Sequence, residues 1–167
     1  MFEINYFSNV NSGLDVDSKV WISNPGANGA PSPSGDLCAM IYVFDADQQL
    51  AECCGCPVTP NGLRTLSVTN DLTSNPLTPN KPQSGVIKIV SSTGVPTCDP
   101  GSPVPTPELI AWGTHIQTPA EGDIAITKTE FEDAQLCSAE LKVLIGKCRA
   151  IQENGSGHGL CSCGTGD

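Results

Sequence analysis

The chain has 167 residues, with 18 acidic and 8 basic side chains and a formal net charge of −10 at pH 7. This balance is opposite to the one that binds nucleic acid or an anionic membrane surface, and no apolar run reaches the ~20 residues of a membrane-spanning helix. The length fits one domain with a core of its own.

The N-terminal segment Phe2–Phe7 is predicted to be a short strand, because apolar and polar side chains alternate along most of it. Such a strand pairs either within its own sheet or with the exposed edge of a neighbouring molecule. The odd number of cysteines favours the second option. We therefore predict an assembly strand that enters a copy of the same protein through Phe2, Ile4, Tyr6 and Phe7.

Up to residue 126 the sequence predicts short strands separated by turns rich in Gly, Pro, Asn and Ser. The second and third strands after the N-terminal segment form an antiparallel hairpin whose turn is centred on Asp47. We expect an antiparallel, immunoglobulin-like β-sandwich over residues 1–126, with the N-terminal strand as an extension. The strands expected after that extension are residues 19–23, 37–44, 50–58, 63–69, 86–90, 109–117 and 124–126.

The pattern changes after residue 126. Thr129 is predicted to cap a helix that has acidic residues in its first turn and ends at Asn154, and a break near Ser138 is left open. Residues 127–167 are thus expected to be a helix and a Gly- and Cys-rich tail, packed on the same domain. One helical face would carry Leu141, Leu144, Ile145, Cys148 and Ile151.

Nine cysteines in 167 residues predict an extracellular or cell-surface protein with three or four disulfides, because reducing compartments rarely retain so many thiols without a metal or redox role. The first residues lack the basic region and apolar core of a signal peptide, so we expect that an export signal was removed. One thiol must be free or intermolecular. The disulfide candidates are Cys38, Cys53, Cys54, Cys56, Cys98, Cys137, Cys148, Cys161 and Cys163.

The predicted hairpin suggests partners for the cysteines of its two strands. A turn centred on Asp47 places Cys38 opposite Cys56, so we expect Cys38 to bond within the cluster that contains Cys53, Cys54 and Cys56. Because neighbouring strand residues point to opposite faces, Cys53 and Cys54 are expected to have separate partners.

The C-terminal cysteines allow a second set of pairings. Cys148 is expected to bond Cys161 or Cys163, which would fold the tail onto the helix. Cys137 cannot bond Cys148 within one continuous helix, since the two would be about 16 Å apart and the Cα atoms of a disulfide lie within about 7 Å.

Metal binding is the alternative use of these cysteines. Cys53 and Cys56 have C-x-x-C spacing, and Cys161, Cys163 and His158 would complete a ligand set. The second group lacks the spacing of a zinc knuckle, so disulfides are favoured. We predict no metal and no cofactor.

The remaining candidates have ordinary structural explanations. Trp21 and Trp112 would line either a carbohydrate platform or the sandwich core, and the core is favoured. Asp45 and Asp47 are more typical of a turn than of a calcium site. His115 lies in no catalytic motif. We predict no enzyme and no catalytic residue.

Several segments resemble a group of uncharacterised, cysteine-rich exported bacterial proteins, and the likeness covers most of the chain. The order of strands and turns is also similar to immunoglobulin-like surface sandwiches, at the level of fold alone. Since the group has no established activity, the resemblance implies no catalytic residue. The segments are VWISNPG, LCAMIYVFD, CCGCP and PNGLRTL at residues 20–26, 37–45, 53–57 and 60–66, with residues 109–117 and 129–136.

Together these features predict a secreted structural protein, the subunit of an extracellular filament or surface assembly. Disulfides and strand exchange would stabilise the assembly, and the partners would be copies of the same chain. The alternative is a secreted binding module for a glycan or a metal.

Overall fold

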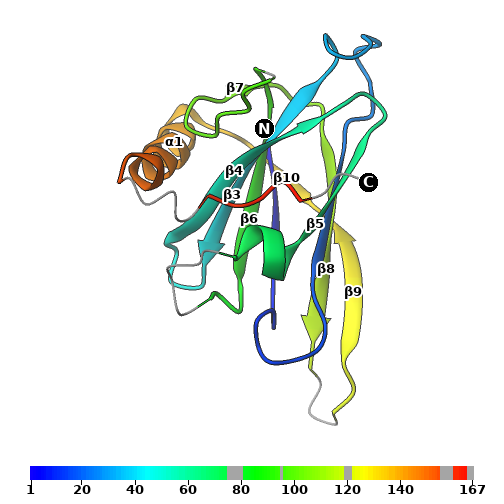
Figure 1. The fold of residues 1–167 in the computed structure, drawn as a ribbon, viewed down its shortest axis with the longest axis vertical. Coiled ribbons are helices and arrows are strands. Elements are labelled where there is room, and N and C mark those ends of the chain that lie inside the picture. The colour runs from blue at the N-terminus through cyan, green and yellow to red at the C-terminus, as the bar shows by residue number, and fades with distance from the viewer. Residues whose placement is uncertain (75–80, 95, 119–121, 155–159, 165–167) are drawn as a thin grey trace.

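The computed structural model describes residues 1–74, 81–94, 96–118, 122–154 and 160–164. Two antiparallel sheets pack face to face, and one helix lies against the outer face of one of them (Figure 1). The prediction of a mainly β protein with antiparallel sheets and one C-terminal helix is confirmed.

The first sheet, sheet A, holds the N-terminal strand in its interior. Its order is β10 (Glu132–Ala134), β1 (Phe2–Phe7), β6 (Gly85–Thr93), β3 (Leu37–Asp45) and β4 (Leu50–Val58), and β7 (Val104–Pro105) also pairs with β6. Sheet B has the order β5 (Leu63–Ser67), β2 (Lys19–Ser23), β8 (Ile110–Gln117) and β9 (Ala125–Glu130), and a short π-helical turn, η1 (Val68–Leu72), follows β5.

Strand alternation divides the buried side chains into two clusters. Ile41 of β3 and Ile89 of β6 meet Ile22 of β2 between the sheets. Met40 and Tyr42, which alternate with Ile41 in β3, lie in the second cluster on the outer face of sheet A. Sheet A is therefore buried on both faces, which explains why the β3 sequence is apolar almost throughout.

The helix α1 (Ser138–Glu153) covers the outer face of sheet A and begins later than predicted. Cys137 is its N-cap, and the backbone N–H of Asn154 donates to the Ala150 carbonyl at its end. Among the described residues, no helix is both long and apolar enough to cross a membrane.

The prediction that Thr129 caps this helix is wrong. Thr129 lies in β9, paired with Gly113 of β8, and its hydroxyl contacts the ring of His115 at 2.7 Å. After Phe131 the chain crosses to sheet A and forms β10, so strands continue past residue 126. The pairing of β9 with β8 and the contact of Thr129 with the buried His115 stabilise a strand here more than the capping residue stabilises a helix. The predicted break at Ser138 is where the helix starts.

The hairpin of β3 and β4 contains a bulge that shifts its register. Near the turn Phe44 pairs with Leu50, as a turn centred on Asp47 requires, but the next pair is Val43 with Glu52. One extra residue, Ala51, has entered β4. Every pair beyond the bulge is displaced by one residue.

The predicted assembly strand is β1, and in this chain it pairs with β6 and β10. Phe2 and Phe7 are buried, whereas Tyr6 is about half exposed. Phe7 packs between the sheets and Phe2 lies in the cluster beneath α1. The N-terminal segment thus contributes to both clusters of its own chain.

Candidate functional site

Eight of the nine cysteines form disulfides, which confirms the expected number of bonds. The ninth, Cys137, is exposed and unpaired. Four disulfides fit an extracellular or other non-cytoplasmic protein. The bonds are Cys38–Cys98, Cys53–Cys148, Cys54–Cys161 and Cys56–Cys163.

The prediction that Cys38 bonds within the β4 cluster is wrong, and the bulge is the reason. Cys38 lies opposite Pro57, and Ala39 lies opposite Cys56. Cys38 consequently points to the outer face of sheet A, while Cys56 points between the sheets. Its partner is Cys98, from the loop that follows β6.

The expected partner of Cys148 is also wrong, although the argument about strand faces is confirmed. Cys53 points to the outer face of sheet A and bonds Cys148 of α1. Cys54 points the other way and bonds Cys161. Neighbouring cysteines therefore do have separate partners. The helix is bonded on the outer face of sheet A, and the tail is bonded on the face that meets sheet B.

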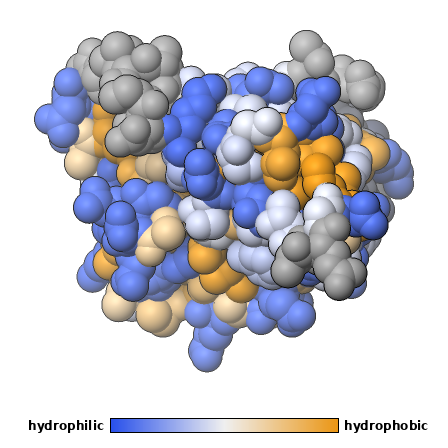
Figure 2. Space-filling view, turned by 90° about the horizontal axis from the view of Figure 1, so that it is seen from below, coloured by the Kyte–Doolittle hydropathy of each residue, from blue (hydrophilic) through white to orange (hydrophobic). Residues whose placement is uncertain are grey.

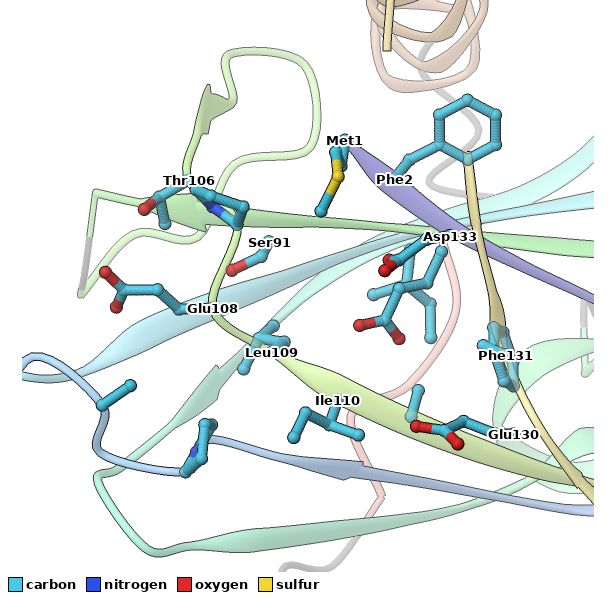
Figure 3. Close-up of a pocket in the computed structure, with 16 residues that line it drawn as sticks. Met1, Phe2, Ser91, Thr106, Glu108, Leu109, Ile110, Glu130, Phe131 and Asp133 are labelled. Carbon is cyan, nitrogen blue, oxygen red and sulfur yellow. The ribbon is translucent and has the colours of Figure 1, made fainter. Parts of the chain in front are cut away.

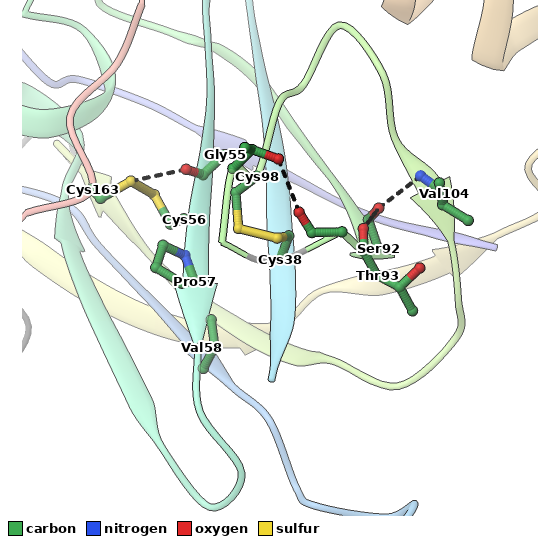
Figure 4. Close-up of a disulfide and its surroundings, with 12 residues drawn as sticks. Cys38, Gly55, Cys56, Pro57, Val58, Ser92, Thr93, Cys98, Val104 and Cys163 are labelled. Atoms are coloured by element: carbon green, nitrogen blue, oxygen red, sulfur yellow. Dashed lines mark hydrogen bonds between the residues drawn. A yellow bond between two sulfur atoms is a disulfide. The ribbon is translucent and has the colours of Figure 1, made fainter. Parts of the chain in front are cut away.

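The Cys98 loop lies directly on β4, as the close-up of this disulfide shows (Figure 4). A Cβ atom on Gly55 would lie 1.7 Å from the carbonyl oxygen of Cys98, so only glycine fits there. Nearby, the Ser92 hydroxyl accepts a 2.8 Å hydrogen bond from the Val104 backbone and holds the end of the same loop.

The metal alternative is not compatible with these bonds. Its cysteine ligands, Cys53, Cys56, Cys161 and Cys163, are all oxidised, so no thiolate remains to bind zinc. The other suggested ligand, His158, lies outside the described residues. Within the described part of the chain, no group of three or more His, Cys, Asp or Glu side chains is placed to hold a metal ion.

Trp21 and Trp112 lie on the outer face of sheet B, so the favoured prediction of a core position is wrong. They are direct cross-strand neighbours in β2 and β8. Val20 and Ile22, on either side of Trp21, are buried between the sheets, and Trp21 therefore points outward. Both tryptophans are only partly buried.

Lys128 of β9 completes this aromatic surface. Its Nζ lies 4.5 Å from the ring centroid of Trp21 and 5.8 Å from that of Trp112, within the range of a cation–π contact. Thr114 lies between Lys128 and the strand that carries Lys19, and its hydroxyl accepts a hydrogen bond from the Lys19 backbone. Two of the eight basic residues thus flank the tryptophan pair.

A separate cleft of about 330 Å³ opens between the sheets near β1 and contains several carboxyl groups. Glu108 and Glu130 lie toward opposite ends of it, with Asp133 between them (Figure 3). Glu3 pairs with Asp133 across β1 and β10, and burial, with the charges of Asp133 and Glu130, raises the pKa of Glu3 to about 8.

His115 and Asp45 have the structural roles that the sequence indicates. The His115 ring is fully buried and stacks on Tyr6 with 3.9 Å between centroids, and burial lowers its pKa. One carboxylate oxygen of Asp45 accepts hydrogen bonds from the backbone of Asp47 and Gln49, which makes it a turn residue.

No family model, curated protein or solved structure matches this chain. The face seen from below is mainly hydrophilic, with small separate hydrophobic patches (Figure 2). Of the features above, the tryptophan pair places two partly exposed rings side by side on one sheet face, next to Lys128 and Thr114.

Proposed function

We propose that this protein is an extracellular module that binds glycans through the outer face of sheet B. The observation that carries the proposal is the direct pairing of Trp21 with Trp112 on that face, beneath Lys128. The four disulfides support the extracellular location. An immunoglobulin-like arrangement of the two sheets is part of the same proposal.

The chemistry of the face suits a sugar chain. The C–H faces of a pyranose pack on indole rings, while Lys128 and Thr114 supply donors and acceptors for hydroxyl groups. Two tryptophans paired across adjacent strands make an aromatic contact area wider than one residue. Because both tryptophans are only partly buried, replacing either one by alanine does not open a cavity in the core.

The Lys128 ammonium further indicates which glycans fit best. The protein carries a net charge of −10, so a polyanion is repelled in general. Lys19 is paired with Asp17 at 3.5 Å, so Lys128, which contacts both rings, is the cation that offers a local partner to a sugar carboxylate. We expect polysaccharides that contain some uronic acid among neutral sugars to bind more tightly than fully neutral ones.

The test compares binding of the native protein, Trp21→Ala and Trp112→Ala to a panel of neutral and uronate-containing polysaccharides by affinity electrophoresis and calorimetry. Each substitution should weaken binding at least about tenfold, which corresponds to about 1.4 kcal/mol. Val143→Ala, at an exposed position on α1, is the matched control and should bind normally. Native affinity in both tryptophan variants, or no binding to any glycan, would overturn the proposal.

Lys128→Ala separates the two parts of this proposal. It should lower affinity for uronate-containing polysaccharides and leave neutral ones nearly unchanged, because only the former lose a charge partner. An equal loss for both classes would mean that Lys128 acts by holding the rings in place.

A filament or surface assembly is the second candidate. The observation that favours it is that β1 buries Phe2 and Phe7, so the β1 strand of another copy would fill an equivalent site. Cysteines introduced at Tyr6 and Val86, which pair across β1 and β6, would report exchange as crosslinks between molecules. Crosslinks formed only within one chain at high protein concentration would contradict this candidate.

A further inference from the structure

The strand β4 is an edge strand of sheet A and has few of the features that prevent an exposed edge from pairing with the edge of another molecule. It is nine residues long, and its one charged residue, Glu52, is buried. Long apolar edges pair with edges of other chains unless they are covered, charged or interrupted by proline. Pro57, near the end of the strand, protects only that end.

Three alternate carbonyl groups of β4 point away from β3, and each is met by a different group. The Cys53 carbonyl accepts a 3.1 Å hydrogen bond from the Cys161 backbone, and the Pro57 carbonyl accepts one of 2.8 Å from the Arg64 guanidinium. Between them, the Cys163 sulfur lies 3.2 Å from the Gly55 carbonyl oxygen (Figure 4). A disulfide sulfur has no proton, so this is a covering contact.

Two of these three groups come from residues 160–163, which we call the strap. It runs parallel to β4, with a bridge between Leu160 and Cys53. Both of its disulfides have a sequence separation of 107 residues, so the strap keeps one register along β4. Its Ser162 backbone also donates to the Asp71 carbonyl at 2.8 Å, next to sheet B.

We propose that the strap is a covalently anchored cover of the β4 edge, and that the uncovered edge pairs with the β4 edge of a second copy. The same edge from two molecules can meet antiparallel about a twofold axis. No exposed charge on β4 opposes this contact. Cys53 and Gly55 would then exchange backbone hydrogen bonds with the other molecule in place of the strap.

Uncovering the edge requires a reductant, for which a dithiol suffices. Each strap disulfide takes up two electrons and two protons and becomes two cysteine thiols, while the dithiol closes to a cyclic disulfide. The strap is then held only by noncovalent contacts, namely its hydrogen bonds and the packing of Cys161 and Cys163 against the cluster between the sheets. This inference concerns sheet A and is independent of glycan binding on sheet B.

The main test replaces all four strap-bond cysteines by alanine and measures molecular mass by light scattering across a range of concentrations. We expect the monomer to become a dimer as concentration rises. Hydrogen exchange should show that the Gly55 amide is protected in the dimer. Every protein in the series carries Cys137→Ser, so that disulfide-linked dimers do not form. The substitutions are C54A, C56A, C161A and C163A.

Two matched controls each remove a single strap bond. The C54A/C161A and C56A/C163A variants retain one anchor and should stay monomeric. A folded quadruple variant that remains monomeric, or that dimerises without protecting Gly55, would overturn the proposal. Should that variant not fold, the oxidised protein is reduced with a dithiol after folding and alkylated. Molecules in which mass mapping shows only the strap bonds opened are then analysed in the same way.

Discussion

The two sheets of this protein are stabilised in different ways. All four disulfides have one end in sheet A, and none has an end in sheet B. The helix covers the outer face of sheet A, whereas the outer face of sheet B presents Trp21 and Trp112. The disulfides are concentrated in sheet A. Sheet B has none, and its outer face carries the surface proposed to bind a ligand.

This division indicates that stability and binding are separable. Cys38 lies in β3 and the other three strand cysteines lie in β4, so two neighbouring strands anchor the Cys98 loop, the helix and the strap. Substitutions in sheet A should mainly change the free energy of unfolding. Substitutions on the outer face of sheet B should mainly change affinity.

The largest effect is expected from breaking the bond between β4 and α1. Replacing Cys53 and Cys148 by alanine removes a crosslink over 95 residues, which should lower the free energy of unfolding by about 3–5 kcal/mol. Leu144 and Cys148 are the buried residues of α1, so the helix should also loosen. Thermal unfolding and hydrogen exchange of α1 would measure both changes. A loss no greater than that of Trp21→Ala, expected to be about 1 kcal/mol at this partly buried position, would contradict the comparison.

A second effect in sheet A comes from a single methyl group. Gly55→Ala places a Cβ atom against the Cys98 carbonyl and should destabilise the protein by roughly 2–4 kcal/mol, because the disulfide-bonded loop cannot easily move away. Gly146→Ala is the control: a Cβ atom there meets nothing within 4 Å, so it should stabilise α1 by up to about 1 kcal/mol. Denaturant unfolding of both variants checks the contrast, and equal effects would show that the loop yields.

A smaller effect should depend on pH and on Glu3. With its pKa raised from 4.5 to about 8 in the folded protein, Glu3 keeps a proton that the unfolded chain has lost. Stability should therefore fall as pH rises from about 4.5 to 8, by roughly 1–3 kcal/mol after solvent screening. Glu3→Gln should remove most of this slope and be the more stable protein at pH 8. An unchanged slope in unfolding titrations would exclude Glu3 as its source.

The sequence predicted the sheet elements well, because their signals are local. Alternating apolar residues and turns marked the strands, and the hairpin turn was placed correctly, as the Phe44–Leu50 pair shows. The wrong helix start has a different origin. Thr129 has the chemistry of a cap, but its hydroxyl is used by His115, and no local pattern reports that contact.

The candidate sites were less predictable, since they depend on register and on which face is covered. The bulge at Ala51 decides which way Cys38 points relative to Cys56, and nothing in the sequence marks it. Trp21 alternates with two buried aliphatic residues, a signal that would have placed it on the outer face. The Glu3–Asp133 pair depended on an unforeseen strand, β10.

The disulfide pattern also has a consequence for the order of folding. Each bond joins a cysteine among the first 56 residues to one at residue 98 or later. In a chain exported N-terminus first, four thiols arrive before any correct partner, and two of them are adjacent. Oxidation at that stage makes only incorrect bonds, so maturation depends either on delay until the last residues emerge or on a catalyst that reshuffles disulfides.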